Sequence, residues 1–257
     1  MTTKHIHVFT EGKIGVIQLN RPEVANALNR HMVKEIVEQM EAFDRDETIR
    51  IILLKGNKKA FAAGADIEEM MDETPLSLEL ADPFADWDRM TLIKKPTIAA
   101  VNGFALGGGF ELALHCDLIL AGENAEFGFP EVTLGVMPGA GGTQLLTRLM
   151  GRAKALEWIW LGKSMSAEEA LRCGVINRVV ADALVTEEAM RLASQLADQA
   201  PISLRLIKEA VNAAGDTTLM EGFKLERKNF YLSFASQDQK EGMHAFKEKR
   251  SPSFKGV

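Results

Sequence analysis

The sequence has little of what marks several large classes of protein. Its 257 residues include only two cysteines, Cys116 and Cys173, and both lie in apolar surroundings, so we expect buried thiols and no disulfide framework. Met1–Phe9 lacks the apolar core of a signal peptide, and no uncharged apolar run reaches the ~18 residues of a membrane helix. The net charge is −6 and the pI is near 5.5. We therefore expect a soluble cytoplasmic protein that binds neither nucleic acid nor a membrane.

Common catalytic and metal-binding motifs are also missing. The five histidines show no HExxH spacing and no cysteine partner, which argues against a metal site. There is no GxSxG elbow, and the glycine-rich run Pro138–Thr143 lacks the Lys-Ser/Thr end of a phosphate-binding Walker loop. The first strand–helix–strand unit contains no GxGxxG, so a nicotinamide-binding Rossmann fold is disfavoured. We expect no metal and no cofactor.

The spacing of hydrophobic residues, which make up 46% of the chain, predicts an α/β fold with a parallel sheet. Short apolar or alternating runs predict strands over Lys4–Phe9, Ile14–Leu19, Ile49–Leu54, Pro96–Val101, Asp117–Ala121 and Val175–Val180. Helical spacing predicts helices over Asn26–Phe43, Phe110–Cys116, Thr143–Met150, Leu184–Ala200, Ile202–Ala213 and Leu219–Phe234. Ser166 with Glu169 matches a capping box and predicts one more short helix.

The segment Met71–Asp88 has no clear period. It is acidic and contains two prolines, so we expect an irregular segment that covers a binding site. Trp87, Met90 and Leu92 are expected to return to the core.

The stretch Val101–Leu112 carries the strongest indication of chemistry. Gly107–Gly109 lie between a predicted strand and a predicted helix, where the first helical N–H groups are free and the helix dipole is positive. Such donors suit an oxygen that gains negative charge during a reaction, and Glu111 adds a carboxylate one turn later. Alone, the glycines are weak evidence, because close strand–helix packing also uses glycine.

Two further segments point to the same kind of site. The small residues of Ala60–Asp66 allow close backbone approach, so this loop could supply a second N–H donor, although a tight turn without a ligand is equally compatible. Pro130 restricts its neighbours and should hold Glu131 in one direction. Two nearby carboxylates cannot both ionise easily, so Glu111 and Glu131 could offer an acid and a base together.

Taken together, the motifs resemble the crotonase superfamily, and most closely the short-chain enoyl-CoA hydratases, over essentially the whole chain. The shared segments are Asn20-Arg21-Pro22, Asn26-Ala27-Leu28, Ala62–Asp66, Lys95–Glu111, Phe127–Glu131, Pro138–Thr143 and Glu241–Lys255. The resemblance implies a spiral of ββα units over residues 1–195, and a C-terminal helical region over residues 196–257 that serves docking and oligomerisation.

The resemblance also implies roles for particular residues. The N–H groups of Ala63 and Gly108 would bind the thioester oxygen, and Glu111 and Glu131 would hold a water between them. A CoA thioester, which is substrate rather than cofactor, would lie along residues that the family uses for binding: Ala25, Ala63, Gly64, Ala65, Asp66 and Gly108. The implied reaction is reversible addition of water across the 2,3-double bond of a 2-enoyl-CoA to give a 3-hydroxyacyl-CoA.

Two other functions stay open at this point. An enoyl-CoA isomerase needs one acid–base carboxylate, at the Glu131 position, whereas a silent acyl-CoA-binding member should have lost a glutamate or an oxyanion glycine. The resemblance extends to hydratases of aromatic-acid degradation as well as to those of fatty-acid β-oxidation. Phe110 and Phe129 replace smaller or more polar residues of the family pattern, which predicts a bulkier, more apolar acyl side.

The C-terminal region is rich in aromatic residues. Phe223, Phe230, Tyr231, Phe234, Phe246 and Phe254 all lie within it. Such helices are typical of surfaces that dock on another surface, either of the same subunit or of a neighbour. With the family's habit, this predicts a homo-oligomer, a hexamer built as a dimer of trimers.

Overall fold

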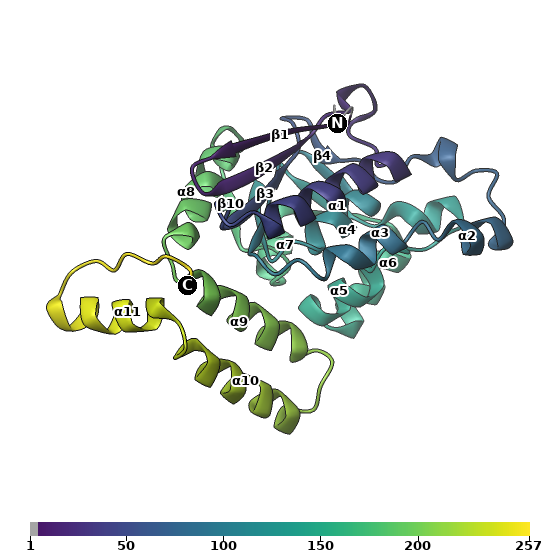
Figure 1. Cartoon of the computed structure of the whole chain (residues 1–257). Helices are drawn as coiled ribbons and strands as arrows, with labels where there is room; N and C mark the ends of the chain where they lie inside the picture. Colours follow the sequence, from purple (N-terminus) through teal and green to yellow (C-terminus); the bar gives the residue numbers. More distant parts are fainter. Residues whose placement is uncertain (1–4) are drawn as a thin grey trace.

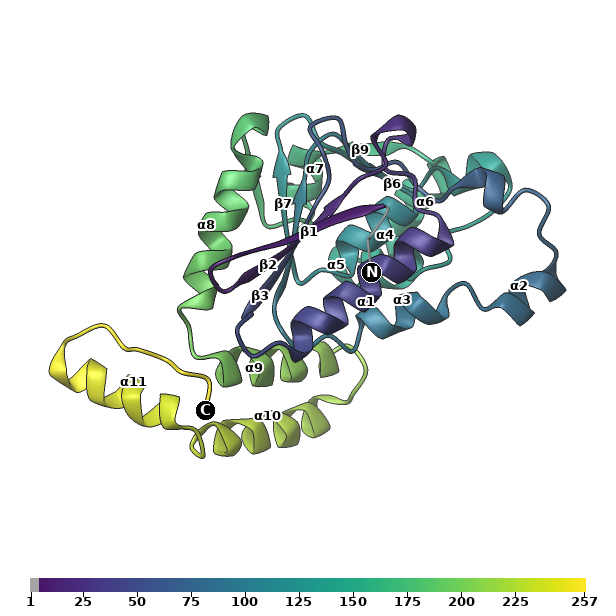
Figure 2. The same cartoon turned by 45° about the horizontal axis from the view of Figure 1, so that its top comes forward.

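The computed structural model describes residues 5–257 and contains two sheets wrapped by helices (Figures 1 and 2). The larger sheet has the order β1-β2-β3-β5-β7-β10 and is parallel except for the β1–β2 hairpin. Its strands are β1 (Ile6–Glu11), β2 (Ile14–Leu19), β3 (Ile51–Lys55), β5 (Thr97–Val101), β7 (Leu118–Gly122) and β10 (Arg178–Val180). The predicted α/β fold with a parallel sheet is confirmed. Residues 1–4, including the expected strand start Lys4 and the first part of the segment Met1–Phe9 judged for a signal peptide, lie outside the described residues.

A smaller sheet, β4-β6-β8-β9, was not predicted. Its strands are β4 (Ala60–Ala62), β6 (Phe104–Leu106), β8 (Glu126–Gly128) and β9 (Ser164–Ser166), each too short to show a sequence period. Along the chain, β3, β5 and β7 of the large sheet are each followed by one strand of the small sheet and then by helical structure. This repetition is the ββα spiral that the resemblance implies.

The large sheet is buried on both faces, which explains its nearly continuous apolar strands. Ile52 and Leu54 face one core cluster, and Ile51 and Leu53 face the other. The first cluster is covered by α1 (Arg30–Arg45) and the second by α8 (Val185–Ala197). The carboxyl ends of β5 and β7 lead directly into the segments that carry Glu111 and Glu131.

Helix α1 begins later than its periodicity predicts. Asn29 caps it by accepting a hydrogen bond from the Met32 N–H at 2.8 Å. Asn26 lies before the helix with a positive φ of 59°, and its buried side-chain amide donates to the carbonyls of Ala60 and Phe61. The predicted start at Asn26 is therefore wrong, because this residue ties the preceding loop to β4.

The segment over Met71–Asp88 is more regular than expected. It contains α2 (Pro75–Ala81), whose first turn Thr74 and Ser77 cap reciprocally, and α3 (Ala85–Met90). Trp87 and Met90 are buried as predicted, but Leu92 is 71% exposed, so its return to the core is wrong. Both helices are too short for a helical period to stand out in the sequence.

Four further helices lie near the small sheet and the site: α4 (Gly108–Leu114), α5 (Gly142–Met150), α6 (Arg152–Leu161) and α7 (Ala167–Arg172). The capping box predicted from Ser166 and Glu169 is present at α7. Both cysteines are free thiols; Cys116 is buried as predicted, but Cys173 is only half-buried. Burial raises the pKa of the Cys116 thiol to about 12, which leaves it inert.

The last three helices extend away from the sheets (Figures 1 and 2). They are α9 (Pro201–Ala213), α10 (Leu219–Ser233) and α11 (Gln237–Glu248), of which α11 was not predicted. The final residues return to the body, where the Arg50 guanidinium donates to the carbonyls of Ala197 and Phe254 at 2.9 and 2.7 Å. None of the helices within residues 5–257 combines the length and apolarity needed to cross a bilayer. The division at residue 195 stays a prediction.

Candidate active site

Glu111 is a buried carboxylate held by two backbone donors. It lies in the first turn of α4 and is 3% exposed. Its Oε1 accepts hydrogen bonds from the N–H groups of Ala140 and Gly142, each at 2.8 Å. Because two donors stabilise the ionised form, this side chain is built to carry negative charge away from water.

The donors depend on the run Pro138–Thr143. A Cβ added to Gly142 would lie 2.6 Å from the Phe129 ring and 3.0 Å from Glu111 Oε1, so only glycine allows this approach. Behind the run, His115 Nε2 lies 2.8 Å from the Ala140 carbonyl oxygen. His115 thus holds Ala140, the residue whose own N–H donates to Glu111, from its carbonyl side. Burial lowers the pKa of His115, which favours the neutral ring.

Glu131 comes from the short 3₁₀ helix Pro130–Leu134, which follows β8 directly. Its Oε1 lies against Gly107, where an added Cβ would be only 2.8 Å away. Its Oε2 is buried without a hydrogen-bond partner among the described residues. A buried carboxylate oxygen without a donor disfavours the ionised form of the side chain and favours the protonated one.

The surroundings act differently on the protonation of the two carboxyl groups. Burial, and to a lesser degree the negative charge of Glu111, raise the pKa of Glu131 to about 7. Burial also raises the pKa of Glu111, but the N–H groups of Gly142 and Ala140 act in the opposite direction. Two backbone donors hold Oε1 of Glu111, whereas Oε2 of Glu131 has no donor among the described residues, so we assign the negative charge of the pair to Glu111 and the proton to Glu131.

Gly107–Gly109 form the junction between the two glutamates, and each of these glycines has a different structural role. Gly107 has φ 50° and ψ −127° and leaves space for Glu131. An added Cβ on Gly109 would lie 2.1 Å from the Ala62 carbonyl oxygen, so this glycine lets α4 pack on β4. Gly108 is the first residue of α4, where no intrahelical acceptor exists, and its N–H finds no acceptor within residues 5–257.

The second predicted loop lies beside Gly108. An added Cβ on Gly108 would lie 3.6 Å from the Ala65 nitrogen and 3.9 Å from the Gly64 carbonyl carbon. This loop is joined to the segment after Ala25: Leu28 N–H donates to the Gly64 carbonyl at 2.7 Å, and Ala63 N–H donates to the Ala25 carbonyl at 3.1 Å. The backbone therefore gathers the residues expected to line the CoA chain.

Two of the expected site residues already have partners. The Ala63 N–H reaches the Ala25 carbonyl at a long 3.1 Å, so a thioester oxygen would have to share this donor or replace that carbonyl. Asp66 forms an ion pair with Arg21, whose two terminal nitrogens each lie 3.0 Å from Oδ2. Arg21 also donates to the Ala27 carbonyl. Asp66 thus fastens the two loops together.

Comparison with known proteins identifies the family. A family model described as enoyl-CoA hydratase/isomerase matches residues 10–257. The chain belongs to this family. It is 48% identical over 255 residues to a probable enoyl-CoA hydratase of Rhizobium meliloti, with 99% of each chain covered. It is 43% identical over 250 residues to 2,3-dehydroadipyl-CoA hydratase of Escherichia coli, covering 97% of this chain and 98% of that protein.

The fold of the enoyl-CoA hydratase/isomerase family is equally clear. The crystal structure of an enoyl-CoA hydratase subunit from Geobacillus kaustophilus superposes with a TM-score of 0.97 at 62% identity, and 99% of both chains is covered. The resemblance to the crotonase superfamily and its ββα spiral is confirmed.

The backbone donors that hold Glu111 were not predicted from the sequence. Pro138–Thr143 was expected only to start a helix, yet it supplies both donors to Glu111. The signal that could have revealed this is a glycine-rich run without a phosphate motif. Phe110 and Phe129 are both buried and stack on each other with ring centroids 4.9 Å apart. Their expected effect on the acyl side stays a prediction.

Proposed function

We propose that this protein is an enoyl-CoA hydratase that adds water reversibly across the 2,3-double bond of a 2-enoyl-CoA thioester. The observation that carries the proposal is the pair of buried glutamates around one glycine junction, with donors on Glu111 and none on Oε2 of Glu131. Relatives named enoyl-CoA hydratase over nearly the full chain support it. CoA is part of the substrate, and the chemistry needs no further cofactor.

The two carboxyl groups suit the two halves of water addition. Ionised Glu111 takes a proton from the water, whose oxygen forms a bond to C3. The electron pair of the double bond moves onto the thioester, and the resulting enolate oxygen receives a hydrogen bond from Gly108 N–H. Neutral Glu131 then delivers its proton to C2. Dehydration reverses these steps, and the pair carries one proton in either direction.

The thioester binding also rests on the two joined loops. Ala63 N–H is proposed as the second donor to the thioester oxygen, opposite Gly108. Ala25, Gly64, Ala65 and Asp66 would lie along the CoA chain. The positions of these residues support this proposal: Gly64 and Ala65 lie against Gly108, and Ala25 contacts Ala63.

The raised pKa of Glu131 predicts the pH profile. Its pKa of about 7 in the free protein means that the doubly ionised pair becomes dominant above neutral pH. We expect kcat/KM for crotonyl-CoA to fall above about pH 7, because Glu131 then lacks its proton. Hydration and dehydration should share this profile, since both use the singly protonated pair. Steady-state rates across pH test it, and a rate that stays constant through the mildly alkaline range would contradict it.

The main alternative is an enoyl-CoA isomerase, which moves a double bond with one carboxylate. Glu111 would have no task in that reaction, yet it is buried and held by two donors, an arrangement that is costly without a function. A silent binding protein is disfavoured because both glutamates and Gly108 are present. We therefore place hydration first.

A direct assay separates these functions. The protein is incubated with crotonyl-CoA, and the loss of conjugated enoyl absorbance is followed; a parallel reaction offers a 3-enoyl-CoA. A hydratase consumes crotonyl-CoA much faster than it shifts the 3-enoyl double bond. The opposite order would indicate the isomerase, and no turnover of either substrate would indicate the binding protein.

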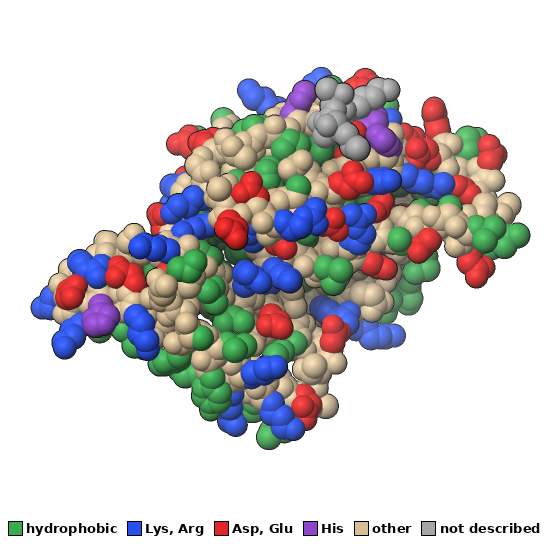
Figure 3. Space-filling view, viewed as in Figure 1, with side chains coloured by type: hydrophobic (Ala, Val, Ile, Leu, Met, Phe, Trp, Pro, Cys, Tyr) green, Lys and Arg blue, Asp and Glu red, His purple; other side chains and the backbone are tan. Residues whose placement is uncertain are grey.

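We also propose that the protein is a homo-oligomer, a hexamer built as a dimer of trimers. Apolar side chains gather over the C-terminal helices on the face seen in Figure 3. On the C-terminal helices, Tyr231 of α10 is 68% exposed and Phe246 of α11 is 88% exposed, far more than aromatic rings usually are in a monomer. A neighbouring subunit would bury these helices. Light scattering at micromolar concentration should give the mass of six chains, and a monomer mass would contradict this proposal.

A further inference from the structure

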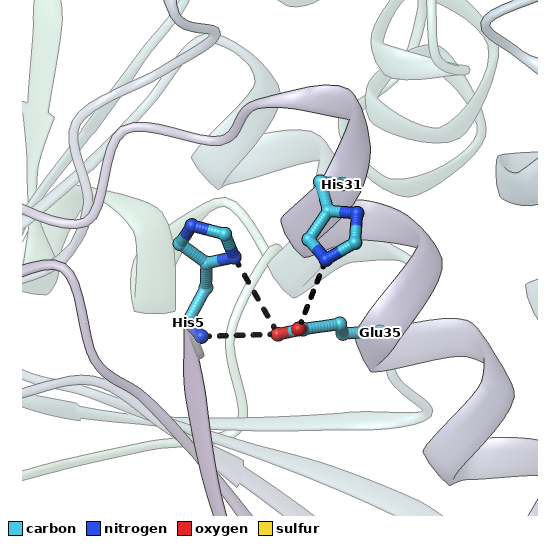
Figure 4. A group of neighbouring side chains, drawn as sticks. All are labelled: His5, His31 and Glu35. Atoms are coloured by element: carbon cyan, nitrogen blue, oxygen red, sulfur yellow. Dashed lines mark hydrogen bonds and ion pairs between the residues drawn. The ribbon is translucent and has the colours of Figure 1, made fainter. Parts of the chain in front are cut away.

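Two histidines and a glutamate outside the active site come together near the start of the chain (Figure 4). His31 and Glu35 lie one turn apart on α1, and His5 immediately precedes β1. His31 Nε2 lies 3.2 Å from Glu35 Oε1, and His5 Nδ1 lies 3.6 Å from Glu35 Oε2. One nitrogen or oxygen of each side chain falls within 4.8 Å of the others.

The distances between these ligand atoms are compatible with a small metal ion bound by all three side chains. Zinc bonds of about 2.0–2.1 Å to nitrogen and oxygen place two tetrahedral ligand atoms about 3.3 Å apart. The distance from His31 Nε2 to Glu35 Oε1 and the distance from His5 Nδ1 to Glu35 Oε2 are both close to that value. The His31 ring is 65% exposed and can rotate to complete the set.

The surrounding backbone holds the ligands in place. His31 and Glu35 are fixed at i and i+4 on a capped helix, so their side chains leave the same face. The His5 backbone N–H donates to Glu35 Oε2 at 3.0 Å, which orients the carboxylate as second-sphere donors do in metal sites. His5 and Glu35 are only 15% and 11% exposed. Two of the three ligands are therefore largely ordered before a metal binds.

The chemistry of the set points to zinc. Two imidazoles and one carboxylate suit Zn²⁺ and related transition metals, whereas Ca²⁺ and Mg²⁺ prefer oxygen ligands alone. We propose that His5, His31 and Glu35 form a Zn²⁺ site, with water as the fourth ligand, that fastens α1 to the start of β1. β1 is an edge strand of the large sheet, so the site would tie down an end of the sheet. No metal was expected from the sequence, because only His31 and Glu35 stand at a suitable spacing and His5 is distant along the chain.

Zinc titration of the full-length protein tests the site. The protein is made without a histidine tag and freed of metal with a chelator, and Zn²⁺ is then added in a calorimeter. We expect one equivalent to bind. At a free Zn²⁺ concentration about 100 times the Kd, the thermal midpoint should rise on the order of 5 °C. With Co²⁺ in place of Zn²⁺, visible bands of four-coordinate cobalt should appear.

Single variants assign the ligands. His5→Gln, His31→Gln and Glu35→Gln should each weaken Zn²⁺ binding at least tenfold and abolish the thermal shift. His7→Gln on β1 and His244→Gln on α11 are matched controls and should bind as the parent does. His31→Gln changes an exposed side chain, so it tests the site even if another variant fails to fold. No Zn²⁺ binding by the parent, or less than tenfold weakening in His31→Gln, overturns the proposal.

Discussion

Replacing either active-site glutamate by glutamine should nearly abolish hydration of crotonyl-CoA. Glu111→Gln removes the group that takes a proton from water, and Glu131→Gln removes the group that gives one to C2. Each change also leaves a single carboxyl where a coupled pair titrated before. We expect losses of at least ~10³-fold in kcat, which is typical when an acid–base group acts directly at a reacting atom.

The two variants should differ in proton exchange at C2. Glu131 reaches that carbon in our assignment, so Glu111→Gln should still exchange the acidic proton of a saturated or 3-enoyl thioester with solvent. Glu131→Gln should not. Deuterium incorporation from heavy water, read by mass spectrometry, measures both. Equal exchange by the two variants, or a greater loss in Glu111→Gln, would reverse the assigned roles while leaving the pair itself in place.

Stability provides the control for these variants. Burial raises the pKa of Glu131 to about 7, so its ionised form is disfavoured in the folded protein. A carboxyl group whose pKa is raised on folding lowers the free energy of unfolding as the pH rises toward that raised pKa. Above neutral pH, Glu131→Gln should therefore unfold at a temperature no lower than the parent. A lost activity with an unfolded variant would not count as evidence for catalysis.

The second large effect should come from Gly108→Pro. Proline removes the N–H that is proposed to bind the thioester oxygen, and this should lower turnover by roughly 10²-fold or more, on the order of 3 kcal/mol. The position can accept the ring: Gly108 is the first residue of α4, where proline is tolerated, and the nearest atom to an added Cβ is 3.6 Å away. Steady-state kinetics with crotonyl-CoA gives the effect.

Gly108→Ala is the matched control, because alanine adds the same Cβ but keeps the N–H. It should retain most of the activity, and circular dichroism of both variants should match the parent. If folded Gly108→Pro kept full hydratase activity, Gly108 would not be an oxyanion donor. If Gly108→Ala lost as much as Gly108→Pro, the effect would be steric.

Elements with a clear hydrophobic period could be predicted from the sequence, and short ones could not. Strand β2 was predicted to the residue, and α9 and α10 to within one residue at each end. Strands β4, β6, β8 and β9 have three residues each, so they cannot repeat a period. Their pairing joins segments that are distant along the chain, for example Ala60 with Phe104 and Phe104 with Glu126.

The active site likewise combines local features that could be predicted from the sequence with contacts between distant residues that could not. The glycine run and the proline beside Glu131 indicated local geometry, so both glutamates and the run Gly107–Gly109 could be chosen from the sequence, whereas Gly108 itself was singled out by the resemblance. The donors to Glu111 are 29 and 31 residues away, and the His115 contact with Ala140 spans 25 residues. Such contacts depend on how the spiral returns to α4. CoA itself came only from the resemblance, because no residue pattern specifies it.

Addition of water to an enoyl thioester is tested most directly by incubating crotonyl-CoA with the protein in water enriched in ¹⁸O and measuring the mass of the intact thioester product by mass spectrometry. We expect 3-hydroxybutyryl-CoA with one ¹⁸O in its acyl chain, formed by the parent and not by Glu111→Gln. Crotonyl-CoA that remains unchanged, with no ¹⁸O in the acyl chain, would contradict it.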